Sequence, residues 1–208
     1  MSANMQSMQT KREKTHRMVL DAAAKLFSEQ GYHGTSLKSI AEAVNMQAGS
    51  LYYHFSSKDQ LMQDVLNKSI YIIYSTVKTE MNKLDEAASF SDKLKAAIRG
   101  HMIAILTYAD YTSASIRNYG QLPDAVHYAS QPARDEYEQF WRALFEQAEV
   151  AGAIRADVDK HLLRLSIFGS MNWSSVWFNA QQNTPVEALA AAQADIFLHG
   201  CLKQGQNR

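Results

Sequence analysis

The stretch MQAGSLYYHFSSKDQL, residues 46–61, places poor helix formers and a row of large rings inside sequence that otherwise favours helices. Gly49 and Ser50 disfavour a helix interior. The four rings at residues 52–55 cannot all face one core, because one helix face holds residues three and four apart. The stretch therefore predicts a short helix with Leu51 turned inward and some of the following rings turned outward.

Composition sets broad limits on the class of protein. The 208 residues suit one large domain or two small ones, and 46% hydrophobic with 20% charged residues is typical of a folded soluble protein. A net charge of 0 argues against a wholly basic nucleic-acid coat protein but leaves room for a local basic patch. The single Cys201 excludes an internal disulfide. We expect a cytoplasmic chain with no membrane contact, since it has neither a signal-peptide core nor an apolar run long enough to span a bilayer.

The first half of the chain contains several signals that start or stop helices. Residues 1–10 are expected to form a disordered tail, and a helix is expected over residues 11–30, stopped by Gly31. A second helix starts at Thr35 or Ser36 and ends near residue 45, an Asn that tolerates the left-handed conformation. A third follows over residues 47–54. A capping box from Ser57 to Gln60 then predicts the start of a long fourth helix.

Helical periodicity continues to the end of the chain. Further helices are expected over residues 91–109, 112–119, 124–129, 133–151, 158–180 and 185–203. The last is expected to begin with a capping box, with Thr184 as N-cap and Pro185 in the first turn. Strand signals are weak throughout. The predicted fold class is all-α, with a small N-terminal unit and a larger C-terminal unit.

Two short helices joined by a tight turn behind a basic helix describe a helix-turn-helix. A helix that enters the major groove needs small residues beside hydrogen-bonding ones. Ala48, Gly49 and Ser50 are small, whereas Gln47 and Tyr52 can bond base edges or phosphate. Phe55, four residues after Leu51, joins it as an inward anchor.

The order and spacing of these residues resemble the DNA-binding domain of the TetR family of transcriptional repressors. The matching pattern is Gly-x3-Thr-Ser-x3-Ile-Ala followed by Gly-x-Leu-Tyr-x-His-Phe-x-x-Lys-x-x-Leu, and it covers about the first 65 residues. The family commonly has Ala-Gly-Val in the turn, where this chain has Val44-Asn45-Met46. Asn replaces Gly at a left-handed position, so the same turn is expected.

The resemblance implies a division into a three-helix DNA-binding domain over residues 11–57 and a helical bundle over residues 58–208 for ligand binding and dimerisation. It also implies DNA contacts: a hydroxyl and N–H contact to phosphate at the start of the second helix, base-edge contacts along the third, and phosphate contacts from the rings and basic side chains. The implied DNA-binding residues are Lys11, Arg12, Thr35, Ser36, Gln47, Ala48, Gly49, Ser50, Tyr52, Tyr53, His54 and Lys58. Each of them taken alone also fits an ordinary surface residue.

A second resemblance concerns the C-terminal half. The pattern Gly-x-x-Asn-Trp-x-x-x-Trp-Phe at residues 169–178 is similar to that of a TetR subgroup that regulates fatty-acid or sterol catabolism with acyl-CoA effectors. It implies a cavity whose rings hold an acyl chain, with Arg117 or Arg164 meeting the CoA phosphates. The candidate effector-binding residues are Arg117, Asn118, Phe168, Met171, Asn172, Trp173 and Trp177. Rings at helical spacing fit a core or a dimer interface equally, and this alternative stays open for Trp173 and Trp177.

The scattered histidines form no zinc-protease spacing, and the chain has no nucleophile elbow and no phosphate-cradling glycine loop. We therefore expect no catalytic residues, no metal and no cofactor. The predicted function is a homodimeric repressor on a palindromic double-stranded operator, released by a small hydrophobic effector such as an acyl-CoA. The competing interpretation is a DNA-binding regulator without a small-molecule ligand, whose C-terminal domain only dimerises or binds a protein partner.

Overall fold

A computed structural model describes residues 2–178 and 184–203, with side chains from Arg12 onward. Within these ranges the chain is helical, and its only pairing of extended backbone is an isolated bridge between Ile154 and Leu202. The all-α fold class is thus confirmed. No helix in the described part is long and apolar enough to cross a membrane.

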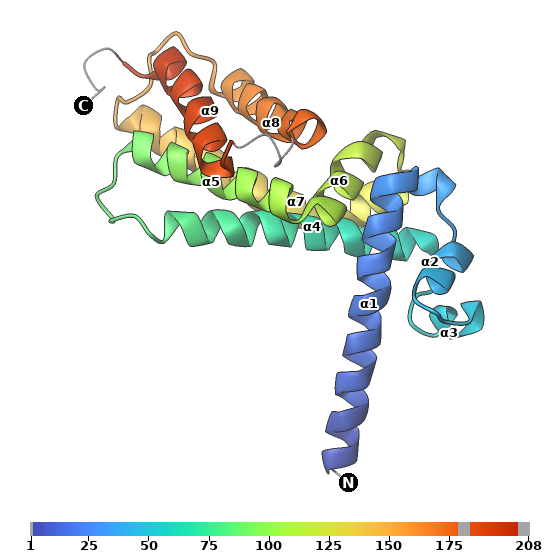
Figure 1. The fold of residues 1–208 in the computed structure, drawn as a ribbon. Coiled ribbons are helices and arrows are strands. Elements are labelled where there is room, and N and C mark those ends of the chain that lie inside the picture. The colour runs from blue at the N-terminus through green and yellow to red at the C-terminus, as the bar shows by residue number, and fades with distance from the viewer. Residues whose placement is uncertain (1, 179–183, 204–208) are drawn as a thin grey trace. The chain divides into compact units, whose positions relative to one another are not determined.

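The chain divides into two compact units (Figure 1). The first holds the residues up to Ser69 together with Asp110–Gln131. Its elements are α1 (Ser2–Gly34), α2 (Leu37–Ala43), α3 (Ala48–Tyr52), the start of α4 (Lys58–Met81), α6 (Ala109–Asn118), η1 (Tyr119–Gln121) and the start of α7 (Asp124–Val150). The segment that carries α6 is therefore packed with the N-terminal helices. The functional boundary expected at residue 57 stays a prediction.

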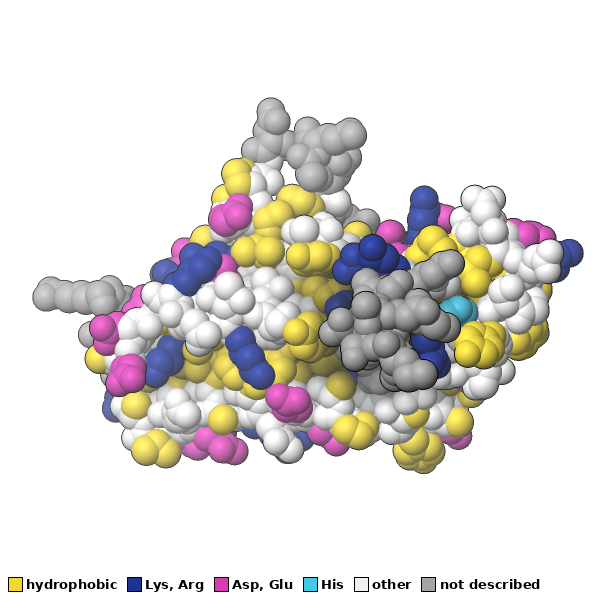
Figure 2. All heavy atoms as spheres, turned by 90° about the horizontal axis from the view of Figure 1, so that it is seen from below, with side chains coloured by type: hydrophobic (Ala, Val, Ile, Leu, Met, Phe, Trp, Pro, Cys, Tyr) yellow, Lys and Arg dark blue, Asp and Glu magenta, His cyan; other side chains and the backbone are white. Residues whose placement is uncertain are grey.

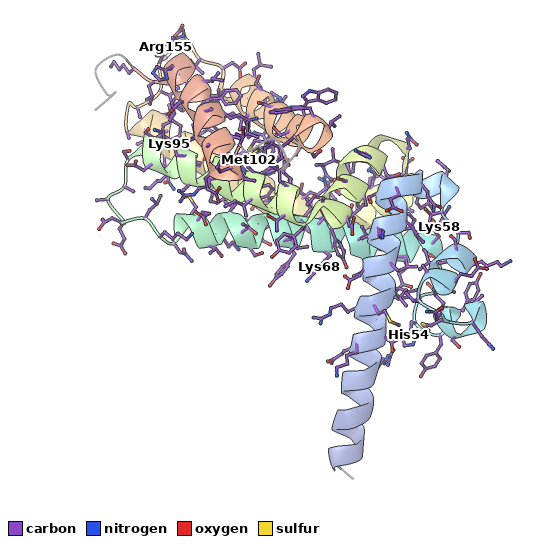
Figure 3. The ribbon with its side chains drawn as sticks, in the orientation of Figure 1. His54, Lys58, Lys68, Lys95, Met102 and Arg155 are labelled. Carbon is purple, nitrogen blue, oxygen red and sulfur yellow. The ribbon has the colours of Figure 1, made fainter. Side chains whose placement is uncertain are left out.

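The second unit holds Ile70–Ala109 and the chain from Pro132 onward. It contains the rest of α4 and α7, together with α5 (Phe90–Thr107), α8 (Lys160–Trp177) and α9 (Val186–Cys201). Helices α8 and α9 both pack on α5 (Figure 1). The core is built from large side chains of α5 and α7, including Met102 (labelled in Figure 3), Trp141 and Phe145, all fully or almost fully buried.

Gly100 lets α4 and α5 approach closely. A Cβ at this position would lie 2.6 Å from the Val77 Cα and 3.1 Å from the Thr76 carbonyl oxygen. Real Cβ atoms do not approach backbone atoms so closely, so the packing of these two helices requires a glycine at residue 100.

Several helix bounds differ from those expected. The α1 backbone is helical from Ser2, earlier than the expected start at residue 11, and it is interrupted at Gly31. The two helices expected over residues 124–129 and 133–151 form one helix, α7, which ends at Val150. Pro132 lies inside it and disfavours a helix interior, but buried side chains anchor the turns on both sides. The expected capping box at Thr184 is wrong: α9 begins at Val186, and its N-cap position is Pro185, which makes no side-chain cap bond.

Candidate nucleic-acid and effector sites

The turn between α2 and α3 is built as the sequence predicted. Asn45 has φ 54°, the left-handed conformation expected of it, and the Met46 N–H bonds the Ala41 carbonyl at 2.8 Å. Leu51 and Phe55 are buried against the core together with Ile40, so their roles as anchors are confirmed. The direction of α3 is therefore fixed by its inward side chains.

The opposite face of α3 is open. Gln47, Gly49 and Ser50 are exposed, and Ala48 is half-buried. A Cβ on Gly49 would find no atom within 4 Å. The exposed face thus carries short side chains and one amide, with no bulky group projecting from its middle.

Aromatic and basic side chains border this face. Tyr52 and Tyr53 are 58% and 75% exposed, and the Arg12 guanidinium lies 5.9 Å from the Tyr53 ring centroid. His54 is half-buried, packs edge-on against Tyr53 with ring centroids 5.5 Å apart, and has no hydrogen-bond partner at Nδ1. Figure 3 labels it beside α1, and Figure 2 shows a His side chain near Lys and Arg side chains and apolar ones on the lower face. The side chain of Lys11 lies outside the described residues.

The Thr35 hydroxyl is used inside the protein, so the hydroxyl part of the expected phosphate contact has no free donor in this structure. The side chain is buried and donates to the carbonyls of Gly31 at 2.8 Å and Leu26 at 3.2 Å, so it closes the end of α1. Ser36 is the N-cap of α2 and forms a capping box with Ser39. The sequence left open whether Thr35 or Ser36 caps the second helix; Ser36 caps it and is exposed, whereas Thr35 is buried.

Lys58 is also engaged inside the protein. Its Nζ donates to the Tyr32 carbonyl at 2.9 Å and to the Thr35 carbonyl at 3.2 Å, and it lies 4.2 Å from the centroid of the Tyr32 ring. Figure 3 shows it at the start of α4. Its charge therefore stabilises the junction of α1 and α4, and the expected free phosphate-binding ammonium is not what the structure shows.

The expected effector residues are divided between the two compact units. Arg117 and Asn118 belong to the first unit, whereas those from Phe168 onward belong to the second. Asn118 is buried, and its amide is fully used by the backbone of Phe27, Tyr32 and Ala114. Both polar ends of this side chain have protein partners, so in this structure the Asn118 amide has no free group to offer an effector.

The tryptophans of α8 also depart from the expectation. Trp173 is 63% and Trp177 is 48% exposed, so neither lines an enclosed cavity of its own chain. Met171 is fully buried, and Phe168 and Asn172 are half-buried. Because Trp173 and Met171 stand two residues apart on α8, they point to different sides of the helix.

A buried polar group that sequence reasoning missed lies beside Phe168. The His101 Nε2 is 3.1 Å from the Asn172 Oδ1, and its Nδ1 is 2.8 Å from the Tyr137 hydroxyl. With the Asn172 oxygen as acceptor, Nε2 carries the proton and Nδ1 accepts from Tyr137. Burial lowers the pKa of His101 to about 4 despite the hydrogen bond to Asn172, so the ring is neutral at pH 7. The apolar residues that flank His101 in the sequence were the signal that could have identified it as buried.

Rings surround this polar group. Phe168 lies 5.8 Å from His101, 5.9 Å from Tyr137 and 5.2 Å from Trp141, all between ring centroids. A separate surface pocket of about 240 Å³ is lined by Arg142, Phe145, Glu146, Lys160, His161 and Arg164. Arg164 is buried there and its Nη1 lies 2.5 Å from Glu138, so this charge is already paired. No cluster of metal-ligating side chains occurs among the described residues.

Comparisons with known proteins cover both halves of the chain. A family described as "Bacterial regulatory proteins, tetR family" matches residues 19–65, and one described as "Tetracyclin repressor-like, C-terminal domain" matches residues 87–201. The transcriptional repressor KstR2 of Rhodococcus jostii is 26% identical over 187 residues, 88% of each chain. The transcriptional regulator UidR of Escherichia coli K12 is 40% identical over 62 residues, 30% of this chain and 32% of UidR.

A likeness to solved structures supports the fold. The structure of AibR in complex with isovaleryl coenzyme A and operator DNA superposes with a TM-score of 0.77 at 24% identity, covering 87% of this chain and 96% of AibR. The short α3 behind a tight turn, with its open outer face, defines a helix-turn-helix regulator of transcription. The chain belongs to the TetR family of DNA-binding transcriptional repressors. Members of this family are transcription regulators that bind operator DNA and act as dimers.

Proposed function

We propose that this chain acts in the cytoplasm as a homodimer that places two copies of α3 in successive major grooves of a palindromic operator, about 34–36 Å apart. The observation that carries this proposal is the open face of α3, where Gln47, Gly49 and Ser50 are exposed and a Cβ on Gly49 would meet no atom within 4 Å. Short polar groups on such a face can reach base edges without a steric barrier.

Base reading and phosphate binding fall to different residues in this proposal. Gln47, Ala48, Gly49 and Ser50 lie along the base edges. The phosphate contacts come from Ser36, Tyr52, Tyr53 and His54 and from the basic side chains of Lys11 and Arg12. Thr35 and Lys58 support these residues from within the protein, since their polar groups close the end of α1.

Helix α8 offers an apolar surface for the second subunit. The exposed side chains Leu162, Leu165, Trp173 and Val176 repeat at spacings that place them on one helix face, and Trp177 lies beside them. An apolar stripe of this kind is usually buried by a partner, and two-fold symmetry makes the same stripe meet itself. We assign Trp173 and Trp177 to this interface.

The effector in this proposal is a small hydrophobic molecule, with an acyl-CoA thioester as the specific class. Phe168, Tyr137 and Trp141 supply aromatic surface around the polar pair His101 and Asn172, which is the composition expected of a site for an apolar ligand. The motif on α8 supports the acyl-CoA class, and so does the likeness in fold to AibR, whose structure is a complex with isovaleryl coenzyme A and operator DNA. Arg117, which is exposed, remains a candidate for contact with phosphate.

A genomic footprint of the full-length protein tests the regulatory function and returns operator sequences. Calorimetry with long-chain acyl-CoA, followed by release of the protein from one recovered operator, tests the effector. Palindromic sites occupied by the protein, heat of binding and release from DNA are expected. If the protein occupies palindromic sites but acyl-CoA gives neither heat of binding nor release from DNA, the acyl-CoA proposal is contradicted. The competing interpretation then holds, in which the C-terminal half only dimerises or binds a protein partner. An absence of specific footprints would contradict the DNA-binding proposal itself.

A further inference from the structure

The turn that ends α1 is closed by a side chain from far along the sequence. Gly31 has φ 76° and ψ 167°, so the helical hydrogen-bond ladder is interrupted there. Asn118, the last residue of α6, accepts a hydrogen bond from the Tyr32 N–H at 2.6 Å and donates one to the Phe27 carbonyl at 3.0 Å. One amide thus satisfies a donor and an acceptor on the two sides of the turn, where a helix end leaves backbone groups without regular partners.

Asn118 is held in place for this role. Its side chain is 2% exposed, and its second N–H bonds the Ala114 carbonyl in its own helix at 2.8 Å. The oxygen and both N–H groups therefore all have partners. An Asn in this position can act as a fixed clamp on the α1 turn, because turning its amide away would leave buried polar groups without partners.

A second bond ties α6 to α1 at a distance from the first. The Tyr111 hydroxyl donates to the Asp21 carboxylate at 2.6 Å, and the Tyr111 side chain is 9% exposed. Burial and the bond to Asp21 raise the pKa of Tyr111, so the hydroxyl stays a donor. Two attachments separated along both helices fix an orientation, whereas a single one would leave a pivot. The residues of both attachments belong to the first compact unit.

The clamped turn leads directly into the DNA-binding helices. Thr35, whose hydroxyl bonds the Gly31 carbonyl, is followed by Ser36, the N-cap of α2. The direction of α2, and of α3 packed against it, therefore depends on the geometry of the turn at Gly31.

We propose that Asn118 is a positioning residue for DNA binding, and that with the Tyr111–Asp21 bond it makes α6 part of the rigid body that carries α3. This inference goes beyond the proposed function, because it needs neither the effector nor its identity.

The test uses the full chain and a DNA duplex that the wild-type protein has selected from a randomised library, with binding followed by fluorescence anisotropy. Asn118→Ala is expected to bind this duplex about tenfold more weakly, as loss of one or two buried hydrogen bonds implies. Hydrogen exchange of the Tyr32 amide should accelerate, while amides of α5 and α9 keep their protection. Gln193→Ala is the matched control, since it removes a buried amide bonded to Ser174 in the second unit. It should change affinity by less than about twofold.

Asn118→Asp gives a signature that general destabilisation would not. An ionised carboxylate keeps an acceptor for Tyr32 but faces the Phe27 carbonyl without a proton, whereas the protonated acid reproduces both bonds. Its affinity relative to wild type at the same pH should therefore recover as pH falls. Should Asn118→Ala fail to fold, Tyr111→Phe removes only the second attachment and is expected to weaken binding several-fold. Wild-type affinity in a folded Asn118→Ala, or an equal loss in Gln193→Ala, would overturn the proposal. If Asn118→Ala does not fold, wild-type affinity of Tyr111→Phe would overturn the proposal instead.

Discussion

Three polar side chains at the end of α1 bond the protein's own backbone. Thr35 bonds the carbonyls of Leu26 and Gly31, Lys58 bonds those of Tyr32 and Thr35, and the Asn118 amide spans the same turn. Each satisfies groups that the end of α1 leaves without regular partners. At the scale of single residues, the site therefore consists of an exposed set that faces DNA and a second set that holds it in place.

Lys58→Ala tests this distinction. Losing two hydrogen bonds from a half-exposed ammonium should lower the free energy of unfolding by about 1 kcal/mol. Because the ammonium serves the protein backbone, the slope of log affinity against log salt should not change. Lys38→Ala is the control, because Lys38 is exposed and pairs with Glu42 on its own helix. This variant should leave the free energy of unfolding almost unchanged. A slope flatter by about one unit would instead show that Lys58 neutralises a phosphate.

His101 makes the second unit sensitive to acid. Its pKa is lowered to about 4 by burial from an ordinary value of 6.5, so the unfolded chain binds the proton more readily than the folded chain. Stability should therefore fall as pH decreases from about 6.5 toward 4, by up to about 3 kcal/mol. His101→Gln carries an amide that does not titrate and should lack this part of the pH dependence. Denaturant unfolding at several pH values measures it, and identical pH profiles for the two proteins would contradict it.

At the scale of elements, local signals predicted the stop at Gly31, the turn at Asn45 and the anchors of α3, but not the start of α1. Gly31 and Asn45 both adopt positive φ where the sequence required a helix stop and a tight turn, and Leu51 and Phe55 are the anchors of α3. Each of these features depends on a few neighbouring residues, so it can be predicted from the local sequence. The continuity of α7 through Pro132 depends on tertiary packing on both sides, which no local signal records.

The candidate sites were predictable to different degrees for the same reason. The open face of α3 follows from the positions of its buried anchors, so its residues could be named from sequence. The roles of Thr35, Lys58 and Asn118 depend on carbonyls and amides at the end of α1, some of them many residues away. The exposure of Trp173 likewise depends on which face of α8 packs on α5, and helical spacing alone leaves that choice open.

Gly100 provides an element-scale prediction. Gly100→Ala should lower the unfolding free energy by about 1–3 kcal/mol, because the added Cβ would lie 2.6 Å from the Val77 Cα and would push α4 and α5 apart. Gly200→Ala in α9 is the matched control, since its Cβ would meet nothing within 4 Å. That variant should be neutral or slightly more stable, as Ala favours a helix over Gly. Equal stability of the two variants in thermal unfolding would refute the close-packing argument.

At the scale of the whole molecule, the exposed apolar stripe on α8 is the surface that we propose a second subunit buries. Trp173→Asp should convert the dimer to a monomer, because it places a charge in the middle of a surface that a second subunit is proposed to bury. Light scattering measures the mass in solution. Tyr128→Asp, at an aromatic residue 77% exposed on α7, is the control and should stay dimeric. A dimeric Trp173→Asp would place the interface elsewhere.

The central claim is that the open face of α3 approaches DNA closely, and Gly49→Leu tests it most directly. The free protein has room for this side chain, since a Cβ there meets no atom within 4 Å, and Leu favours a helix more than Gly does. Thermal stability should therefore be unchanged or higher. Affinity for a selected operator duplex, measured by fluorescence anisotropy, should fall by more than about tenfold. A stable Gly49→Leu protein with wild-type operator affinity would contradict the account.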